Sequence, residues 1–332
     1  MVKNIIIGGD LVMKNILVTG AMGQIGSELT LFLRKKYGNN NVIASDLKNK
    51  NIKELLDTGP FEQIDVLDGE KLNKIVSKYK INSIIHLAAI LSGVGEQKPL
   101  LTWNINMNGL HNVLEVAREK ECQVFVPSSI AAFGPSTPKN KTPQDTIQRP
   151  TTMYGVTKVA GENLCDYYHQ KFNLDTRGVR FPGLISNKTL PGGGTTDYAV
   201  HIYYEALKNK KYLCPIKKGT FMDMMYMPDA LKAIVDLMET EAENLKHRNA
   251  FNVSSMSFDP EEIAGEIKKH IPDFTLEYEV DPELQKIADS WPNSIDDSTA
   301  RKEWDWKPEF NLKAMTEDML KTLREKFNSQ SS

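Results

Sequence analysis

The sequence predicts an α/β fold: a doubly wound parallel sheet followed by a smaller C-terminal α/β lobe. An apolar strand, Ile16-Leu17-Val18, runs into a glycine-rich turn and then into an amphipathic helical pattern. Short apolar runs alternate with helical patterns as far as Pro182, which is typical of βαβ units. Beyond Pro182 the alternation becomes irregular. We therefore expect one domain over residues 13–182, to which later segments return, and a second lobe over residues 183–326.

Composition narrows the class of partner. The chain has 332 residues, 40% of them hydrophobic and 25% charged, and a formal net charge of −2. This charge gives no strong field to attract nucleic acid or an anionic membrane, so we expect a small-molecule partner. The three cysteines, Cys122, Cys165 and Cys214, are widely spaced, which argues against disulfides and a zinc site and favours the cytoplasm. Residues 1–12 precede Met13 as a leader of uncertain status, and we exclude them from the fold argument.

The first candidate site is the turn formed by residues 19–26, Thr-Gly-Ala-Met-Gly-Gln-Ile-Gly. Small residues let the backbone approach a pyrophosphate, and the following helix offers unpaired N–H groups and the positive end of its dipole. A plain tight turn is the alternative. Asp46 ends the second expected strand, where a carboxylate accepts hydrogen bonds from both ribose hydroxyls of NAD and repels a 2′-phosphate. We therefore expect NAD rather than NADP, with a surface aspartate as the alternative, and these cofactor residues: Gly20, Gly23, Gln24, Ile25, Gly26 and Asp46.

Two more strands extend the expected sheet. Residues 61–68 read as a third strand, and residues 81–89 read as a buried strand that ends in small residues, which admit a ligand. A loop over residues 90–96 follows at the sheet edge, where loops carry ligand contacts, and it makes Ser92 a candidate. Helices are expected over residues 69–80 and 99–120, and we expect the loop over residues 130–149 to cover a cofactor.

Tyr154 and Lys158 are the candidate catalytic pair. Their spacing places the phenol and the ammonium on one face of a helix, one turn apart. Free tyrosine has a pKa of about 10, so a nearby lysine and a positively charged nicotinamide ring would together favour its use as a general base near neutral pH. The same spacing also occurs at Tyr167/Lys171 and Tyr204/Lys208, so the pattern alone does not choose among the pairs.

Context favours Tyr154 and Lys158. Ser129 lies upstream at the end of an apolar run, where a strand would bring its hydroxyl to the sheet edge. A Ser, Tyr and Lys set downstream of a glycine turn resembles the short-chain dehydrogenase/reductase superfamily, and the GxxGxxG spacing is that of its extended, epimerase-like branch. Within this branch the chain resembles the metal-free, NAD-dependent L-threonine 3-dehydrogenases over residues 126–134, 154–158, 181–186, 191–200 and 290–292.

The resemblance implies a Rossmann fold with NAD as cofactor and no metal. It implies oxidation of the 3-hydroxyl of L-threonine to 2-amino-3-oxobutyrate, with Tyr154 as general base assisted by Lys158 and Ser129. It implies further NAD contacts from both Tyr154 and Lys158 and from these residues: Asp65, Val66, Leu87, Ala88, Ala89, Asn106, Phe181 and Pro182. It implies that the amino acid faces these residues: Ser92, Ser129, Tyr154, Gly194, Thr196 and Trp291. It also implies a homodimer formed through helices 99–120 and 154–172.

A sugar-nucleotide epimerase or dehydratase remains an alternative, because it would use the same Ser, Tyr and Lys. A non-catalytic NAD-sensing protein is disfavoured by the Tyr/Lys pair. Residues 191–197 place three glycines before an expected helix that starts near Thr195, and this arrangement would bind a carboxylate. A simple helix cap is the alternative there. Residues 186–201 contain Lys188 and His201 but no arginine, which favours a small anion over a diphosphate.

Overall fold

The central element is a parallel sheet of six strands, seen in the computed structural model, which describes residues 13–50, 52–190 and 194–330. The leader and residues 191–193 of the glycine turn lie outside the described residues. The strand order is β3-β2-β1-β4-β5-β7. The strands are β1 (Ile16–Thr19), β2 (Val42–Asp46), β3 (Phe61–Gln63), β4 (Ser83–His86), β5 (Gln123–Phe125) and β7 (Thr176–Arg177). The prediction of a doubly wound parallel sheet is confirmed, and its order reverses between β1 and β4, where such sheets bind ligands.

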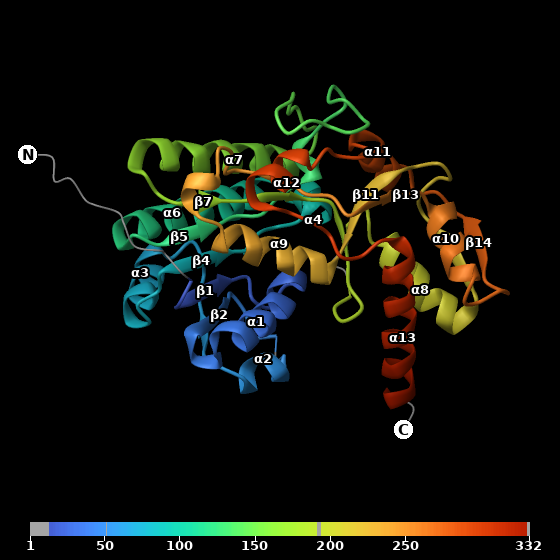
Figure 1. Cartoon of the computed structure of the whole chain (residues 1–332), viewed down its shortest axis with the longest axis horizontal. Helices are drawn as coiled ribbons and strands as arrows, with labels where there is room; N and C mark the ends of the chain where they lie inside the picture. The colour runs from blue at the N-terminus through green and yellow to red at the C-terminus, as the bar shows by residue number, and fades with distance from the viewer. Residues whose placement is uncertain (1–12, 51, 191–193, 331–332) are drawn as a thin grey trace, which may run out of the picture.

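Helices cover both faces of this sheet (Figure 1). Alternate side chains of a strand point to opposite faces, so Ile16 and Val18 pack into one core and Leu17 into another. The first core includes α1 (Gln24–Tyr37) and α9 (Met227–Glu239). The second includes α3 (Gly69–Lys78), α6 (Gly109–Lys120) and α7 (Met153–Phe172). Burial on both faces explains why these strands read as apolar runs rather than as alternating patterns.

Two expected elements differ in detail. The third strand ends at Gln63 rather than at residue 68, because Asp65 accepts a hydrogen bond from the Leu67 N–H and Asp68 caps α3. The helix over residues 99–120 is continuous in path but divides into α5 (Pro99–Trp103), a π-helical turn (Asn104–Asn108) and α6. Between β2 and β3 lies the short α2 (Lys53–Asp57).

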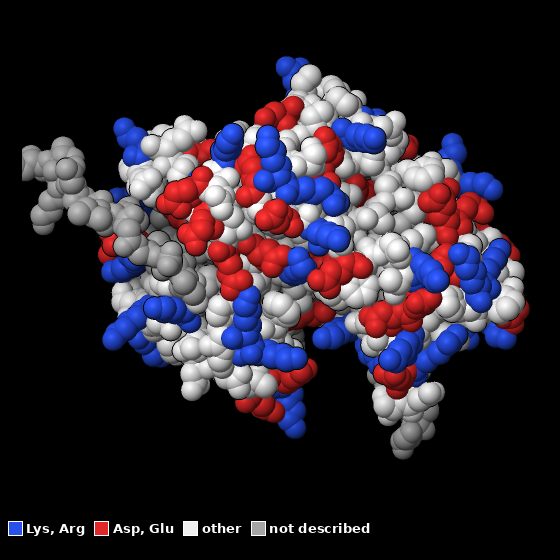
Figure 2. Space-filling view, viewed as in Figure 1, with Lys and Arg blue, Asp and Glu red and all other residues white. Residues whose placement is uncertain are grey.

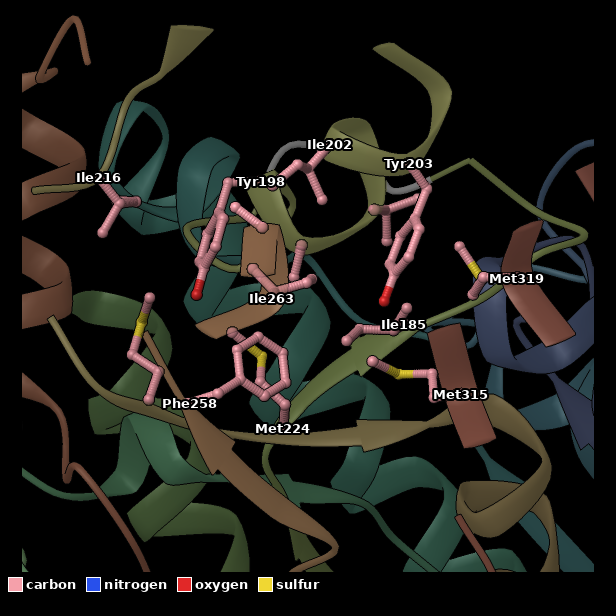
Figure 3. Packing of buried hydrophobic residues seen from close by; sticks show 14 of the residues in the cluster. Ile185, Tyr198, Ile202, Tyr203, Ile216, Met224, Phe258, Ile263, Met315 and Met319 are labelled. Atoms are coloured by element: carbon pink, nitrogen blue, oxygen red, sulfur yellow. The ribbon is translucent and has the colours of Figure 1, made fainter. Parts of the chain in front are cut away.

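Two small sheets extend the structure beyond the central one. One joins β9 (Gly183–Ile185), β11 (Met222–Tyr226) and β13 (Met256–Phe258), and the other pairs β10 (Lys211–Cys214) with β14 (Thr275–Tyr278). They pack with α8 (Tyr198–Asn209), α10 (Pro260–Lys268), α11 (Pro282–Ser290) and α13 (Leu312–Gln330). Figure 3 shows the core of this part, in which Tyr198, Tyr203 and Phe258 are almost fully buried.

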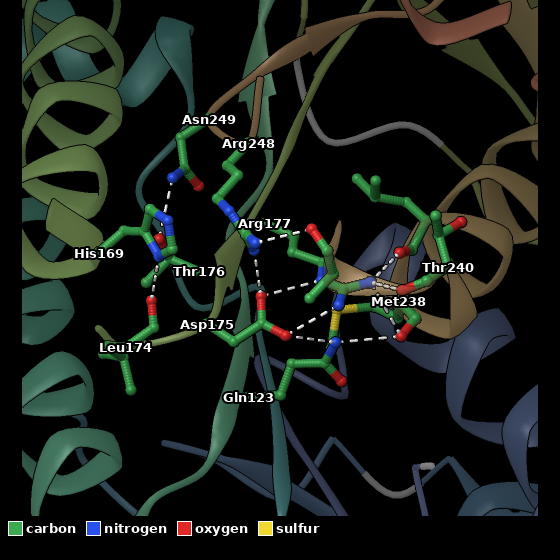
Figure 4. Close-up of polar contacts among 12 residues, drawn as sticks. Gln123, His169, Leu174, Asp175, Thr176, Arg177, Met238, Thr240, Arg248 and Asn249 are labelled. Atoms are coloured by element: carbon green, nitrogen blue, oxygen red, sulfur yellow. Dashed lines mark hydrogen bonds and ion pairs between the residues drawn. The ribbon is translucent and has the colours of Figure 1, made fainter. Parts of the chain in front are cut away.

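A third short sheet and a buried arginine lie in the part of the chain built around the central sheet. In that sheet β8 (Val179–Phe181) lies between β6 (Ser128–Ser129) and β12 (Phe251–Asn252). Arg177 forms an ion pair with Asp175 and donates to the Leu237, Met238 and Thr240 carbonyls at the end of α9 (Figure 4). The Leu237 carbonyl also accepts from the Thr240 N–H, and the arginine anchors this end of α9 to the main sheet.

The surface is mixed in charge. Figure 2 shows lysine and arginine interspersed with aspartate and glutamate over the face in view. No described helix is both long enough and apolar enough to cross a membrane.

Candidate active site

A cavity of about 240 Å³ opens at the carboxyl ends of β1, β4 and β6. This is the edge of the sheet at which the strand order reverses. Most of the predicted site residues line it: Gly20, Gly23, Gln24, Ile25, Gly26, Leu87, Ala89, Ser92, Ser129, Tyr154, Lys158, Phe181, Pro182, Gly194, Thr196 and Trp291. The structure therefore brings together residues that are far apart in the sequence.

The glycine turn forms a close backbone cradle at one end of the cavity. A Cβ on Gly20, whose φ is 71°, would lie 2.6 Å from the Ala88 backbone nitrogen. A Cβ on Gly26 would lie 2.2 Å from the Gly20 carbonyl oxygen. The Gln24 Nε2 is buried and has no hydrogen-bond partner among the described residues. A tight, side-chain-free turn at a helix N-terminus with an unused donor fits a dinucleotide pyrophosphate.

The residues predicted for the adenosine end lie outside the lining of this cavity. Asp46 ends β2, and its Oδ2 accepts a hydrogen bond of 2.9 Å from the Met22 N–H, at the glycine turn. Asp65 is exposed, whereas Val66 is buried against Gly109. Their contacts with adenine and ribose stay predictions.

Ser129, Tyr154 and Lys158 converge because of three local structures. Ser129 ends β6, and Tyr154 lies in the first turn of α7, where the Thr152 hydroxyl accepts from the Gly155 N–H as a helix cap. One turn later, Lys158 Nζ lies 5.3 Å from the centre of the Tyr154 ring. The Lys158 ammonium donates a hydrogen bond of 2.7 Å to the Pro127 carbonyl.

Burial dominates the electrostatics of the pair. It raises the pKa of Tyr154 to about 12, against a smaller lowering effect of the Ser129 hydroxyl. Burial also lowers the pKa of Lys158 to about 8, although the Glu162 carboxylate opposes this shift. The expected reduction of the phenol pKa by Lys158 is therefore absent from the protein alone, because desolvation penalises both charged forms.

A smaller cavity lies behind Lys158. It is lined by Ala88 and Asn106, two predicted residues, and by His86. Asn106 joins two segments, since its Nδ2 donates to the Ile90 carbonyl and to the Thr157 hydroxyl and its Oδ1 accepts from the Ile90 N–H. Burial lowers the pKa of His86 to about 3, so this imidazole is neutral near pH 7.

The far end of the main cavity differs from the expectation. Helix α8 begins at Tyr198 rather than near Thr195, and neither threonine caps it. Instead the Asp197 Oδ2 accepts a hydrogen bond of 2.6 Å from the Gly194 N–H, which we expected to bind a substrate anion. Ser92 is buried in the short helix α4 (Ser92–Gln97) rather than in an open loop.

The sequence interpretation missed two polar residues at this end. Thr195 and Asp197 both line the cavity. The Thr195 hydroxyl is buried and has no hydrogen-bond partner among the described residues, so it is available to a ligand. The only sequence signal was a charged residue directly after the Thr-Thr pair. Trp291, which follows α11, is 7% exposed and also lines the cavity.

Comparisons with known proteins agree with this architecture. A relative from Staphylococcus haemolyticus, described as an uncharacterized epimerase/dehydratase, is 56% identical over 314 residues, 95% of this chain and 99% of the relative. An X-ray structure of L-threonine dehydrogenase from Clostridium difficile is 64% identical with a TM-score of 0.94, covering 95% of this chain and 98% of that one. A monomeric L-threonine 3-dehydrogenase from a metagenome, in its apo form, is 48% identical with a TM-score of 0.89, covering 93% and 99%.

A family model supplies the assignment. It matches residues 16–254, which include the glycine turn, Asp46, Ser129 and the Tyr154/Lys158 pair. The matched span also contains every strand of the six-stranded sheet. The chain belongs to the NAD dependent epimerase/dehydratase family.

Proposed function

We propose that this protein is an NAD-dependent L-threonine 3-dehydrogenase, which oxidises the 3-hydroxyl of L-threonine to 2-amino-3-oxobutyrate. One observation carries the proposal: a single cavity connects a dinucleotide cradle and a partly buried Ser, Tyr and Lys set to a small polar end with one carboxylate. The similarity to the threonine dehydrogenase from Clostridium difficile supports this substrate.

Tyr154 has the role of general base in this reaction. Its phenol oxygen takes the proton of the substrate hydroxyl, while the Ser129 hydroxyl binds the same substrate oxygen. NAD, when bound against Phe181 and Pro182, supplies the hydride acceptor and a positive ring charge that offsets the raised pKa of Tyr154. Lys158, whose ammonium lies 5.3 Å from the centre of the Tyr154 ring, would hold a nicotinamide ribose beside the phenol.

The substrate end is revised from the sequence-based expectation. Asp197 offers a carboxylate to the ammonium group of an amino acid, and the Thr195 hydroxyl offers an unused donor to its carboxylate. Ser92, Gly194 and Thr196 complete this end of the cavity. Trp291 excludes water above the bound amino acid.

Charge favours an amino acid over a nucleotide sugar. Lys158 is the one cationic side chain among the described residues that line the cavity. A nucleotide sugar carries a diphosphate that needs cationic contacts beyond the cofactor site. The epimerase alternative therefore lacks an anion site of the required charge in this part of the chain.

The same proposal extends to assembly and location. We propose a homodimer, because α5 and α7 expose several large apolar side chains: Leu100, Trp103, Val156, Tyr167 and Phe172. We propose a cytoplasmic location because the widely spaced cysteines do not favour disulfides. Leu100 is 86% exposed, and exposed apolar side chains that lie together often mark a protein–protein interface. The monomeric metagenome relative makes a direct mass measurement of this protein necessary. We also propose that the chain divides functionally near residue 182, with NAD mainly on the N-terminal side.

Formation of NADH tests the proposal. Purified protein is mixed with NAD and, separately, with L-threonine, D-threonine, L-serine and UDP-sugars. We expect NADH with L-threonine, and much less with its D-isomer and with L-serine. Interconversion of a UDP-sugar without threonine-dependent NADH would replace the proposal with the epimerase alternative.

A further inference from the structure

The loop over residues 134–149 is joined to the segment that follows α11. In Figure 1 this green loop lies at the top of the molecule, next to α11. The Asn293 and Ser294 N–H groups donate to the Lys139 carbonyl, at 2.8 and 3.2 Å, and the Thr142 N–H donates to the Ser294 carbonyl. Of residues 130–149, Ile130 is the one member among the described residues that line the main cavity, and the expectation that this loop covers the cofactor stays a prediction.

Lys139 makes the side-chain part of this junction. Its ammonium donates a hydrogen bond of 2.9 Å to the Trp291 carbonyl and another to the Asp289 carbonyl. These carbonyls lie at the C-terminal end of α11, where carbonyls lack helical partners and the helix dipole is negative. A half-buried ammonium is therefore well placed to fix the point at which Trp291 leaves the helix.

The base of the loop is fixed to the central part of the protein. Arg180, which is buried, donates to the Gln144 carbonyl at 2.7 Å, and the Gln144 side chain donates to the Ala250 carbonyl. In the sequence the loop lies between Ser129 and Tyr154. Through Lys139, Trp291 is thus tied to the segment that connects the two catalytic side chains.

We propose that Lys139 is a positioning residue that holds the Trp291 indole against the substrate end of the cavity. This inference rests on the proposed function only for the identity of the substrate. Loss of the ammonium frees the Trp291 backbone, and the indole then closes the cavity less completely. Binding of the small substrate weakens, while the nucleotide cradle at the opposite end is unaffected.

Lys139→Met tests the proposal, because methionine keeps much of the apolar stem and removes the donor. We expect the KM for L-threonine to rise about tenfold, the size of one charged hydrogen bond. The affinity for NADH, followed by nucleotide fluorescence, and the unfolding midpoint should stay as in the wild type. Lys139→Arg should restore most of the KM, since guanidinium also donates to carbonyls.

Lys141→Met is the matched control. Lys141 lies on the same loop, and the contact that it makes with the α11 segment is through its backbone N–H, to the Ser294 hydroxyl. Its ammonium is exposed, so this variant should behave as the wild type. Hydrogen exchange of peptides spanning residues 289–296 gives a readout that needs no substrate, and exchange should accelerate in Lys139→Met but not in Lys141→Met.

The outcomes separate the two proposals. A wild type that makes no NADH from L-threonine overturns the proposed function, yet the exchange experiment still decides the role of Lys139. Unchanged exchange together with an unchanged KM in Lys139→Met overturns the positioning role. A lower unfolding midpoint with equal losses for threonine and NADH, and no rescue by arginine, also overturns it, because that pattern describes general structural damage.

Discussion

Tyr154→Phe separates catalysis from folding at this site. The partly buried Tyr154 side chain lines the cavity, and the substitution removes one oxygen from it and leaves the ring in place. Ser129 keeps a partner when this oxygen is lost, because its Oγ accepts a hydrogen bond from the Ala131 N–H at 3.2 Å. We therefore expect the free energy of unfolding to change by less than about 1.5 kcal/mol, the net value of one hydrogen bond.

The effect on turnover should be much larger. A general base contributes about 10²- to 10⁴-fold to rate, which corresponds to about 3 to 5 kcal/mol of transition-state stabilisation. The pH dependence gives a second signature. Because burial raises the pKa of Tyr154 to about 12 and lowers that of Lys158 to about 8, wild-type kcat/KM should rise with pH through neutrality and level off above about pH 8, where the lysine loses its charge.

The assay is initial-rate NADH formation at saturating NAD, together with NADH titration to confirm that the variant still binds nucleotide. Tyr167→Phe is the control, because Tyr167 is 52% exposed and belongs to the same helix and the same Tyr/Lys spacing. The control should retain wild-type turnover. A loss of less than tenfold in Tyr154→Phe, or a large loss in Tyr167→Phe, would refute the assignment of the base.

Three further outcomes follow from the structure. Asp46→Ser should raise the KM for NAD about tenfold and narrow the preference over NADP, measured by rates with each nucleotide, because the ribose acceptor and its repulsion of a 2′-phosphate are lost. Arg177→Met should lower the free energy of unfolding in urea by about 1 to 3 kcal/mol, because it removes the donor to the Thr240 carbonyl and one of the partners of Asp175, which keeps its ion pair with Arg248. Burial raises the pKa of Asp223 to about 7, so the stability that its bound proton contributes is fully present below about pH 4 and is lost as pH rises to 7. In Asp223→Asn, the free energy of unfolding measured with urea should fall less steeply over this pH range than in the wild type. Equal pH dependence in the two proteins would contradict the reasoning.

The central sheet and its cavity edge were predictable because each depends on short-range patterns. Strands buried on both faces are mostly apolar, so the apolar residues of Ile16–Thr19 and Ser83–His86 allowed both strands to be predicted from the sequence. The glycine turn is equally local, since a Cβ on Gly20 or Gly26 would collide with backbone. Parallel strands place their carboxyl ends at one edge, so the residues that follow them had to converge.

The substrate end was less predictable because its hydrogen bonds differ from those that the local sequence favours. A threonine before a helical pattern indicates a cap, but the Asp197 carboxylate takes the Gly194 N–H and moves the helix start to Tyr198. The contact between Lys139 and Trp291 joins segments that are far apart in the chain. The hydrophobic pattern of neither segment predicts a contact with the other, so the contact becomes apparent only in the folded structure.

The Tyr154/Lys158 spacing alone does not predict that Tyr154 can act as a general base near neutral pH. Burial acts on both side chains at once, and it favours a neutral phenol and weakens the charge of the lysine that should stabilise a phenolate. The Glu162 carboxylate partly restores the lysine charge, but the Lys158 ammonium donates to the Pro127 carbonyl. The protein alone therefore holds the base in its inactive protonation state near neutral pH. A positive charge must enter the cavity beside Tyr154, so the nicotinamide ring of NAD, whose pyrophosphate fits the glycine cradle, is as necessary to the chemistry as the pair itself.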